Sequence, residues 1–318
     1  MKSAVGAAQI TGIDPQIASI VPRRIILSRK GWDSKAGGWP NPILPGGHPL
    51  SLPIPDSNSG VTYGDLYLPD GRKLVGEMVR QLSNGKWGPD DELHLDPDIR
   101  QNAVKRNEFR AAFGQCGGAQ THLTKQKVCS GPSAESNDLF LYFGRYREVE
   151  EQSGRWRYRR RGPEIQLIFG WLQISEMISL ADGRPEWAQS HPHCRLSGIV
   201  QAELGKRKVN NNTLYVARRE LSFSSKPGAG VFQRFDTRTP DPKRLTREDS
   251  KASVWRLPGF FNRAGLTCLS NMGSKTAWTA EGNSWIVQRR GPGQEFVLET
   301  NGRERETLDW LQELFATT

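Results

Sequence analysis

The sequence predicts an α+β protein with a β-rich, barrel-like core, flanking helices and long loops rich in glycine and proline. Two apolar runs, residues 138–144 and 165–174, are hydrophobic at almost every position, which is typical of strands buried on both faces. Further strand-like runs are short and bounded by turn residues, and helical patterns are few. Many short strands with few helices favour a barrel-like core.

Along the chain, residues 1–22 have weak periodicity, so we expect a flexible N-terminal tail followed by one compact domain over residues 23–318. Residues 24–29 predict the first strand. Residues 31–55 are too rich in glycine and proline for a helix or for most central strands. A long ordered loop of this kind is often functional.

Helical patterns are expected at residues 98–113, where Asp98 is a plausible N-cap, and around residues 118–126. Short strands follow at residues 212–217, 230–232, 284–288 and 295–298. Residues 303–315 predict a C-terminal amphipathic helix that packs on the domain through one apolar face. That face consists of Leu308, Leu311, Leu314 and Phe315.

An arginine-rich hairpin is expected between the two buried strands. Arg155, Arg157 and Arg159 alternate with Trp156 and Tyr158, so the guanidinium groups and the rings fall on opposite faces of a strand. Arginine suits the phosphates of a nucleic acid and flat rings suit its bases. The alternative is a solvated basic hairpin lying on a β-domain.

Composition narrows the class of protein and of partner. The chain has 318 residues, with 44 Lys+Arg against 34 Asp+Glu, and its net charge of +10 favours a polyanionic partner. No apolar run approaches the roughly 20 residues of a membrane span, and the N-terminus lacks the order of a signal peptide. The four cysteines form no Cys-x-x-Cys pair. We therefore expect a soluble, cytoplasmic protein with free thiols and no obligate protein partner.

Several stretches together resemble the nucleotide modification associated domain 3 family, over nearly the whole chain from about residue 24. They are residues 26–34, 53–55 with 62–66, 94–98, 113–123 (Phe-Gly-Gln-Cys-Gly-Gly-Ala-Gln-Thr-His-Leu), 138–144 and 169–173 (Phe-Gly-Trp-Leu-Gln). Such domains are associated with modified bases in phage and bacterial DNA. The chain is also similar to an anti-phage DNA glycosylase that excises glucosylated hydroxymethylcytosine.

A second resemblance, to the small barrels of the PUA, ASCH and EVE group, involves the two buried strands. It implies a barrel whose concave mouth holds a flipped base. Together the resemblances imply a DNA glycosylase that acts on double-stranded DNA containing modified bases, flips out and excises the base, and leaves an abasic site. The alternative is a non-catalytic reader of modified bases. Length favours the enzyme, because a bare reader barrel needs only about half of this chain.

Asp33 is the leading candidate for the catalytic carboxylate of a glycosylase. A carboxylate beneath the sugar stabilises the positive charge that builds up as the N-glycosidic bond breaks. Asp33 follows Arg29 and Lys30, which we expect to bind the DNA backbone together with the hairpin arginines, and it precedes a glycine pair. Alternatively, Asp33 caps a turn.

Histidines and aspartates at residues 94–98, with His122, His191 and His193, raise the question of a metal. His94-x-Asp96 lacks a diagnostic metal spacing, and His191 is held extended before Pro192. We therefore expect Asp96 and Asp98 to cap a helix and His94 or His122 to face the pocket. No metal and no organic cofactor is predicted.

The remaining candidates would recognise the flipped base. Gln115, Gln120 and Gln173 can each donate and accept hydrogen bonds, as reading a base edge or a sugar hydroxyl requires. The expected stacking residues are Tyr142, Phe143 and Trp171, for which core packing is the alternative.

Overall fold

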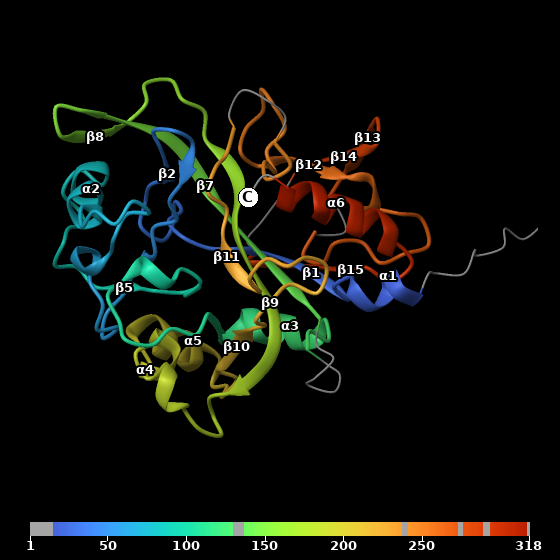
Figure 1. Cartoon of the computed structure of the whole chain (residues 1–318), viewed down its shortest axis with the longest axis horizontal. Helices are drawn as coiled ribbons and strands as arrows, with labels where there is room; N and C mark the ends of the chain where they lie inside the picture. The colour runs from blue at the N-terminus through green and yellow to red at the C-terminus, as the bar shows by residue number, and fades with distance from the viewer. Residues whose placement is uncertain (1–14, 130–136, 237–240, 273–275, 289–292, 317–318) are drawn as a thin grey trace, which may run out of the picture.

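The computed structural model of the chain describes residues 15–129, 137–236, 241–272, 276–288 and 293–316. They form a mixed α+β fold around one large sheet, with strand order β15-β1-β7-β9-β10-β6 and four further strands attached to it (Figure 1). The strands of this sheet are β1 (Arg24–Arg29), β2 (Asn41–Leu44), β3 (His48–Pro49), β6 (Ala112–Gln115), β7 (Leu139–Gln152), β8 (Arg155–Tyr158), β9 (Ile165–Ser179), β10 (Thr213–Ala217), β11 (Ala229–Val231) and β15 (Glu295–Glu299).

The centre of the sheet is the trio β1, β7 and β9. β1 runs parallel to β7, with Leu27 opposite Leu141, and β7 is antiparallel to β9. Successive residues alternate between two apolar clusters: Ile25 and Leu27 belong to one, and Ile26 to the other. The sheet is therefore buried on both faces, which explains why its strands are apolar at nearly every position.

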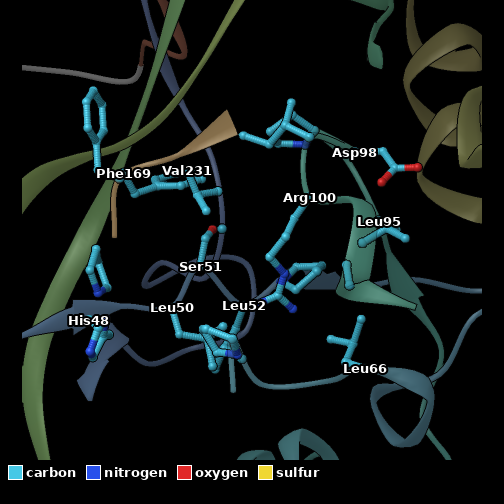
Figure 2. A pocket seen from close by; sticks show the side chains of 18 of the residues that line it. His48, Leu50, Ser51, Leu52, Leu66, Leu95, Asp98, Arg100, Phe169 and Val231 are labelled. Atoms are coloured by element: carbon cyan, nitrogen blue, oxygen red, sulfur yellow. The ribbon is translucent and has the colours of Figure 1, made fainter. Parts of the chain in front are cut away.

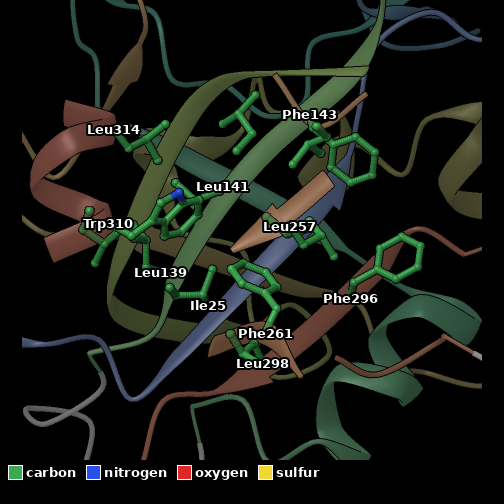
Figure 3. Close-up of a cluster of buried hydrophobic side chains, with 14 of the residues drawn as sticks. Ile25, Leu139, Leu141, Phe143, Leu257, Phe261, Phe296, Leu298, Trp310 and Leu314 are labelled. Carbon is green, nitrogen blue, oxygen red and sulfur yellow. The ribbon is translucent and has the colours of Figure 1, made fainter. Parts of the chain in front are cut away.

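The first of these clusters packs against the C-terminal helix α6 (Glu304–Ala316) and a three-stranded sheet (Figure 3). That sheet consists of β12 (Val254–Pro258), β14 (Ser284–Gln288) and β13 (Trp278–Glu281). In α6 the predicted face of Leu308, Leu311, Leu314 and Phe315 is buried. The expected amphipathic helix is confirmed.

Shorter elements complete the described chain. The other α-helices are α1 (Pro15–Ile20), α2 (Val75–Leu82), α3 (Gly117–Lys125), α4 (Pro192–Arg195) and α5 (Gly198–Arg207). A two-stranded sheet joins β4 (Ile54–Pro55) to β5 (Leu93–His94). The 3-10 helices are η1 (Tyr63–Asp65), η2 (Gln101–Ala103), η4 (Glu186–Ala188) and η5 (Gly259–Phe261).

The helix expected over residues 98–113 is wrong. Only η2 is helical there, and Asp98 instead exchanges two backbone hydrogen bonds with Ala112, which begins β6. The carboxylate of Asp98 also accepts hydrogen bonds from Nη1 and Nη2 of Arg106. These contacts fold the segment back on itself, so its apolar residues are not spaced along one helix face.

The expected barrel is also not found in the described part of the chain. The main sheet is open, with β15 and β6 at the ends of its main path. At the N-terminus, residues 1–14 of the expected tail lie outside the described residues, whereas residues 15–20 form α1 and Val21 is buried. None of the described helices is both long enough and apolar enough to cross a membrane.

Candidate functional site

A cavity of about 670 Å³ lies beyond the end of β1, among segments that are far apart in the sequence. Its walls come from the segment after β1, from the β5 loop, from the junction of β6 and α3, and from the first turn of α5. The start of β15 closes another side. This volume falls in the range of small-molecule sites in proteins.

The cavity brings together six of the predicted site residues. They are Arg29, Lys30, Asp33, His94, Gln115 and His122. Gly118, Ala119 and His122 line it from α3, and Nε2 of His122 lies 2.9 Å from Oγ of Ser270. Burial lowers the pKa of His122, which favours the neutral imidazole.

Asp33 holds a turn at the wall of the cavity, as the alternative interpretation of the sequence expected. Its Oδ1 accepts hydrogen bonds from the backbone amides of Lys35 and Ala36, at 2.7 and 2.9 Å, so it does hold a turn. Its Oδ2 lies 3.4 Å from the guanidinium of Arg29, and the side chain is 18% exposed. The turn fixes the carboxylate at the cavity wall and leaves Oδ2 within reach of a ligand.

Glu295 is a second carboxylate in the wall, and sequence reasoning did not select it. Its Oε1 accepts hydrogen bonds from Nζ of Lys30 at 3.1 Å and from Nε2 of Gln115 at 2.6 Å. Its Oε2 is buried and has no hydrogen-bond partner among the described residues. A buried acceptor without a partner is unusual in proteins, and a ligand could reach this one only after the surrounding side chains shift.

Asp96 lies deep in the same cavity, surrounded by histidines. Its Oδ1 accepts a hydrogen bond from the amide of Gly114 at 2.7 Å and lies 3.3 Å from Nε2 of His191. Its Oδ2 lies 4.0 Å from Nε2 of His94. Burial raises the pKa of the Asp96 carboxyl, but hydrogen bonding and the neighbouring imidazoles outweigh it, and the pKa falls below its ordinary value.

His94 is oriented by Asp56, which joins it to helix α5. Oδ2 of Asp56 lies 2.7 Å from Nδ1 of His94, and its Oδ1 accepts a hydrogen bond from the amide of Ile199 in the first turn of α5. Burial raises the pKa of Asp56, yet the bonds from His94, Ser197 and Ile199 lower it overall. The ionised carboxylate needs a donor, so Nδ1 of His94 carries a proton, and the neutral form of this ring has its acceptor at Nε2.

His193 faces Asp96 from helix α4. Its Nδ1 lies 2.7 Å from Oδ1 of Asn212, and Asn212 donates its amide to the backbone oxygen of His193 at 2.9 Å. The amide is thereby oriented, so Nδ1 carries the proton and Nε2 is unprotonated. Burial lowers the pKa of His193 to about 3, which keeps the ring neutral. A Cβ on Gly114 would lie 2.2 Å from Cδ2 of this ring, so only glycine fits there.

The model of the nucleotide modification associated domain 3 family matches residues 24–299. The chain belongs to this family. It is therefore a domain associated with nucleotide modification, and the cavity lies within the matched region. None of the curated proteins and none of the solved structures compared with the chain matches it.

In this family domain the three predicted stacking residues lie in the apolar core and do not line the cavity. Phe143 and Trp171 belong to the cluster under α6, and Tyr142 belongs to the cluster on the other face of the sheet. The ring nitrogen of Trp171 donates to the backbone oxygen of Pro227. All three rings pack against other rings, so core packing, the alternative interpretation, describes their place.

Two of the predicted glutamines also point elsewhere. Gln120 sits on the buried side of α3, where its side-chain oxygen accepts a hydrogen bond from the hydroxyl of Tyr215 at 2.9 Å. Gln173 bonds to Asn137 and Ser222. Both satisfy buried polar groups of the fold.

The arginine hairpin is present as predicted, but its rings are not free. Trp156 is buried in a third apolar cluster with α2, and the hydroxyl of Tyr158 donates to Pro40 at 2.6 Å. Arg155, Arg157 and Arg159 are exposed, and the last two are ion-paired to Glu150 and Glu148. Figure 1 shows the hairpin at the far end of β7 from α3. The rings stabilise the hairpin, whereas its arginines face solvent.

A smaller cavity of about 70 Å³ shares Gly31 and Asp96 with the main one. Leu50, Leu52, Leu66 and Leu95 surround it, together with Arg100 (Figure 2). The guanidinium of Arg100 donates to the backbone oxygen of Tyr67 at 2.6 Å. This space has room for a few water molecules and is too small for a nucleobase.

Proposed function

We propose that the protein is a DNA glycosylase that flips a modified base into the 670 Å³ cavity, excises it and leaves an abasic site. The single observation behind this proposal is the make-up of that cavity. It combines cations at Arg29 and Lys30, an accessible carboxylate at Asp33 and a buried, partly unsatisfied carboxylate at Glu295. The proposed substrate is glucosylated hydroxymethylcytosine in phage DNA, and the proposed role is anti-phage defence.

Asp33 supplies the chemistry in this proposal. As the N-glycosidic bond lengthens, C1′ of the sugar becomes positive, and the Oδ2 of Asp33 stabilises that charge. Water then adds to C1′ and gives its proton to the solvent or to a carboxylate, while the base leaves with the bonding electrons and takes up a proton. Arg29, 3.4 Å from Oδ2, is placed to contact the phosphate of the flipped nucleotide.

Glu295 and Gln115 supply recognition of the base. After a shift that exposes it, the buried Oε2 of Glu295 accepts the exocyclic amino group that a cytosine presents, as carboxylates do when they read this base. Lys30, which holds the other oxygen of Glu295 and lies 4.3 Å from the Phe113 ring centre, fixes its orientation. The rest of the cavity accommodates a substituent on the ring, such as a sugar.

The test incubates the protein with modified phage DNA and with unmodified DNA, and measures abasic sites and release of the free base. Asp33→Asn keeps the turn acceptor Oδ1 and removes the charge, so turnover falls by about a hundredfold while DNA binding stays. Asp70→Asn, an exposed aspartate paired with Arg72 outside the cavity, is the matched control and keeps full activity.

One result would reject the proposed activity, and another would reject only the role proposed for Asp33. Specific binding of modified DNA without any abasic sites would identify a non-catalytic reader of modified bases. Excision at the parental rate by Asp33→Asn would leave the activity in place but reduce Asp33 to a turn residue, and would pass its role to Asp96 or Asp56.

A further inference from the structure

We propose that His94, Asp96 and His193 bind one divalent transition-metal ion at the floor of the cavity, in place of the metal-free site that the sequence suggested. Each offers one ligand atom, and these atoms lie within 4.8 Å of one another. Metal–ligand distances of about 2.0 to 2.2 Å hold the ligands of a tetrahedral ion about 3.3 to 3.6 Å apart, so the ligand atoms need to close in by at most about 1.5 Å. Two imidazoles and one carboxylate are a donor set for Zn²⁺ and Fe²⁺.

The hydrogen-bond network already presents the correct atoms. Asp56 fixes the proton of His94 on Nδ1, and Asn212 does the same for His193, so each ring directs an unprotonated Nε2 away from its partner. Metal-binding histidines are commonly held in this way by a carboxylate or an amide on the other ring nitrogen. A merely structural cluster does not require both rings to have this tautomer.

Asp96 completes the set with its second oxygen. Its Oδ1 accepts the Gly114 amide and lies 3.3 Å from Nε2 of His191, whereas Oδ2 lies 4.0 Å from Nε2 of His94 and accepts no hydrogen bond from the described residues. His191 accepts the backbone amide of His193 on Nδ1, at 3.3 Å, so its Nε2 carries a proton toward Asp96. His191 thus lies beside the other oxygen of Asp96 and is not one of the three ligands.

The three ligand residues all line the large cavity, so the open coordination positions face its interior. An ion held there binds water or an oxygen of the nucleotide and polarises it. The ion would occupy the same cavity as the flipped base of the proposed function, but its binding does not depend on base excision.

The experiment measures binding of Zn²⁺ and of Co²⁺ to the full-length chain after removal of metal with a chelator, without DNA. Calorimetry should show one site, and bound Co²⁺ should give an absorption spectrum of low-coordinate nitrogen and oxygen ligands. His94→Gln, Asp96→Asn and His193→Gln should each lower the affinity by at least a hundredfold. Loss of the orienting partner in Asp56→Asn or Asn212→Ala should cost about 10- to 100-fold.

Three controls keep the test decisive. His48→Ala removes a histidine outside the cluster, His122→Ala removes one from the same cavity, and both should bind one ion with parental affinity. His191→Gln should still bind one ion, since its side-chain amide can donate to Asp96. Thermal unfolding of each variant separates loss of a ligand from loss of the fold.

The proposal is overturned if the folded parent takes up no ion, or if folded ligand variants bind as tightly as the parent. A site that is lost with His191 and kept with His193→Gln would also overturn it. If the chain excises bases but binds no metal, the proposed function holds and this inference fails. If it binds the metal but excises nothing, this inference holds and the proposed function fails.

Discussion

At the scale of single residues, Cys116 lines the cavity, but burial suppresses the reactivity of its thiol. Burial raises the pKa of its thiol to about 12, and Glu203 and Asp96 add to the rise. At pH 8 only about one molecule in ten thousand then carries the thiolate, which is the reactive form. Iodoacetamide between pH 7 and 9, followed by peptide mass analysis, should label the exposed Cys268 and spare Cys116. Equal labelling would contradict the assigned environment.

Gly114 is the residue at which the cavity is least tolerant of change. Alanine there would place its Cβ 2.2 Å from the ring of His193 while the amide still holds Asp96. We expect Gly114→Ala to lower the free energy of unfolding by about 1 to 3 kcal/mol and to displace His193. Gly205→Ala, in helix α5 with open space around it, should be neutral or stabilising by up to about 1 kcal/mol. Urea denaturation compares the two, and equal effects would refute the predicted clash.

The residues of the site differ in how far sequence could predict them. Arg29, Lys30, Asp33, Gln115 and His122 lie in two contiguous motifs, so local pattern was enough to select them. Glu295 reaches the cavity only through sheet pairing, and Asp56 and Asn212 reach the histidines that line it only through the packing of distant segments. For the cluster of His94, Asp96 and His193, the sequence offered only the His94-x-Asp96 pair and a histidine about 100 residues later. Their spacing alone does not show that these residues meet.

At the scale of elements, buried strands and the C-terminal helix were predictable because periodicity reports burial directly. The strand expected at residues 138–144 begins β7, which continues to Gln152, and the one expected at residues 165–174 begins β9, which continues to Ser179. The helix at residues 98–113 was not predictable, because the pairing of Asp98 with Ala112 and with Arg106 competes with a local pattern. Helix α5 and the strands β12 and β13 were not predicted either.

The hairpin carries the prediction about DNA binding. Arg157 and Arg159 are 62% exposed, and each forms an ion pair with a glutamate of β7. Changing both to glutamate should weaken binding to all DNA sequences and reduce the salt slope by about one unit for each phosphate that the hairpin no longer binds. Arg263→Glu, an equally ion-paired arginine beside α6, is the control and should leave the slope unchanged. Salt titration by fluorescence anisotropy measures both, and an unchanged slope in the hairpin variant would move the DNA surface elsewhere.

At the scale of the whole molecule, the main sheet is buried on both faces. Its strands therefore connect the packing under α6 with the packing near the cavity. Ile25 and Leu27 face the α6 cluster, whereas Ile26 faces the cluster that contains Phe113, over which Lys30 of the cavity lies. A defect under α6 therefore loosens the same strands that end at the cavity. Cores packed at crystal-like density transmit such strain.

Leu311→Ala tests this link. Leu311 is fully buried under α6, so the substitution should cost about 2 to 5 kcal/mol of unfolding free energy. Because one sheet serves both faces, the midpoint in urea should fall by the same amount whether unfolding is followed by circular dichroism or by the reactivity of Cys116, which lies at the cavity. Leu74→Ala, at a leucine that is 39% exposed, should change the stability by less than about 0.5 kcal/mol. If Cys116 keeps its parental midpoint in Leu311→Ala while circular dichroism shifts, the two sides unfold separately and the cavity has a core of its own.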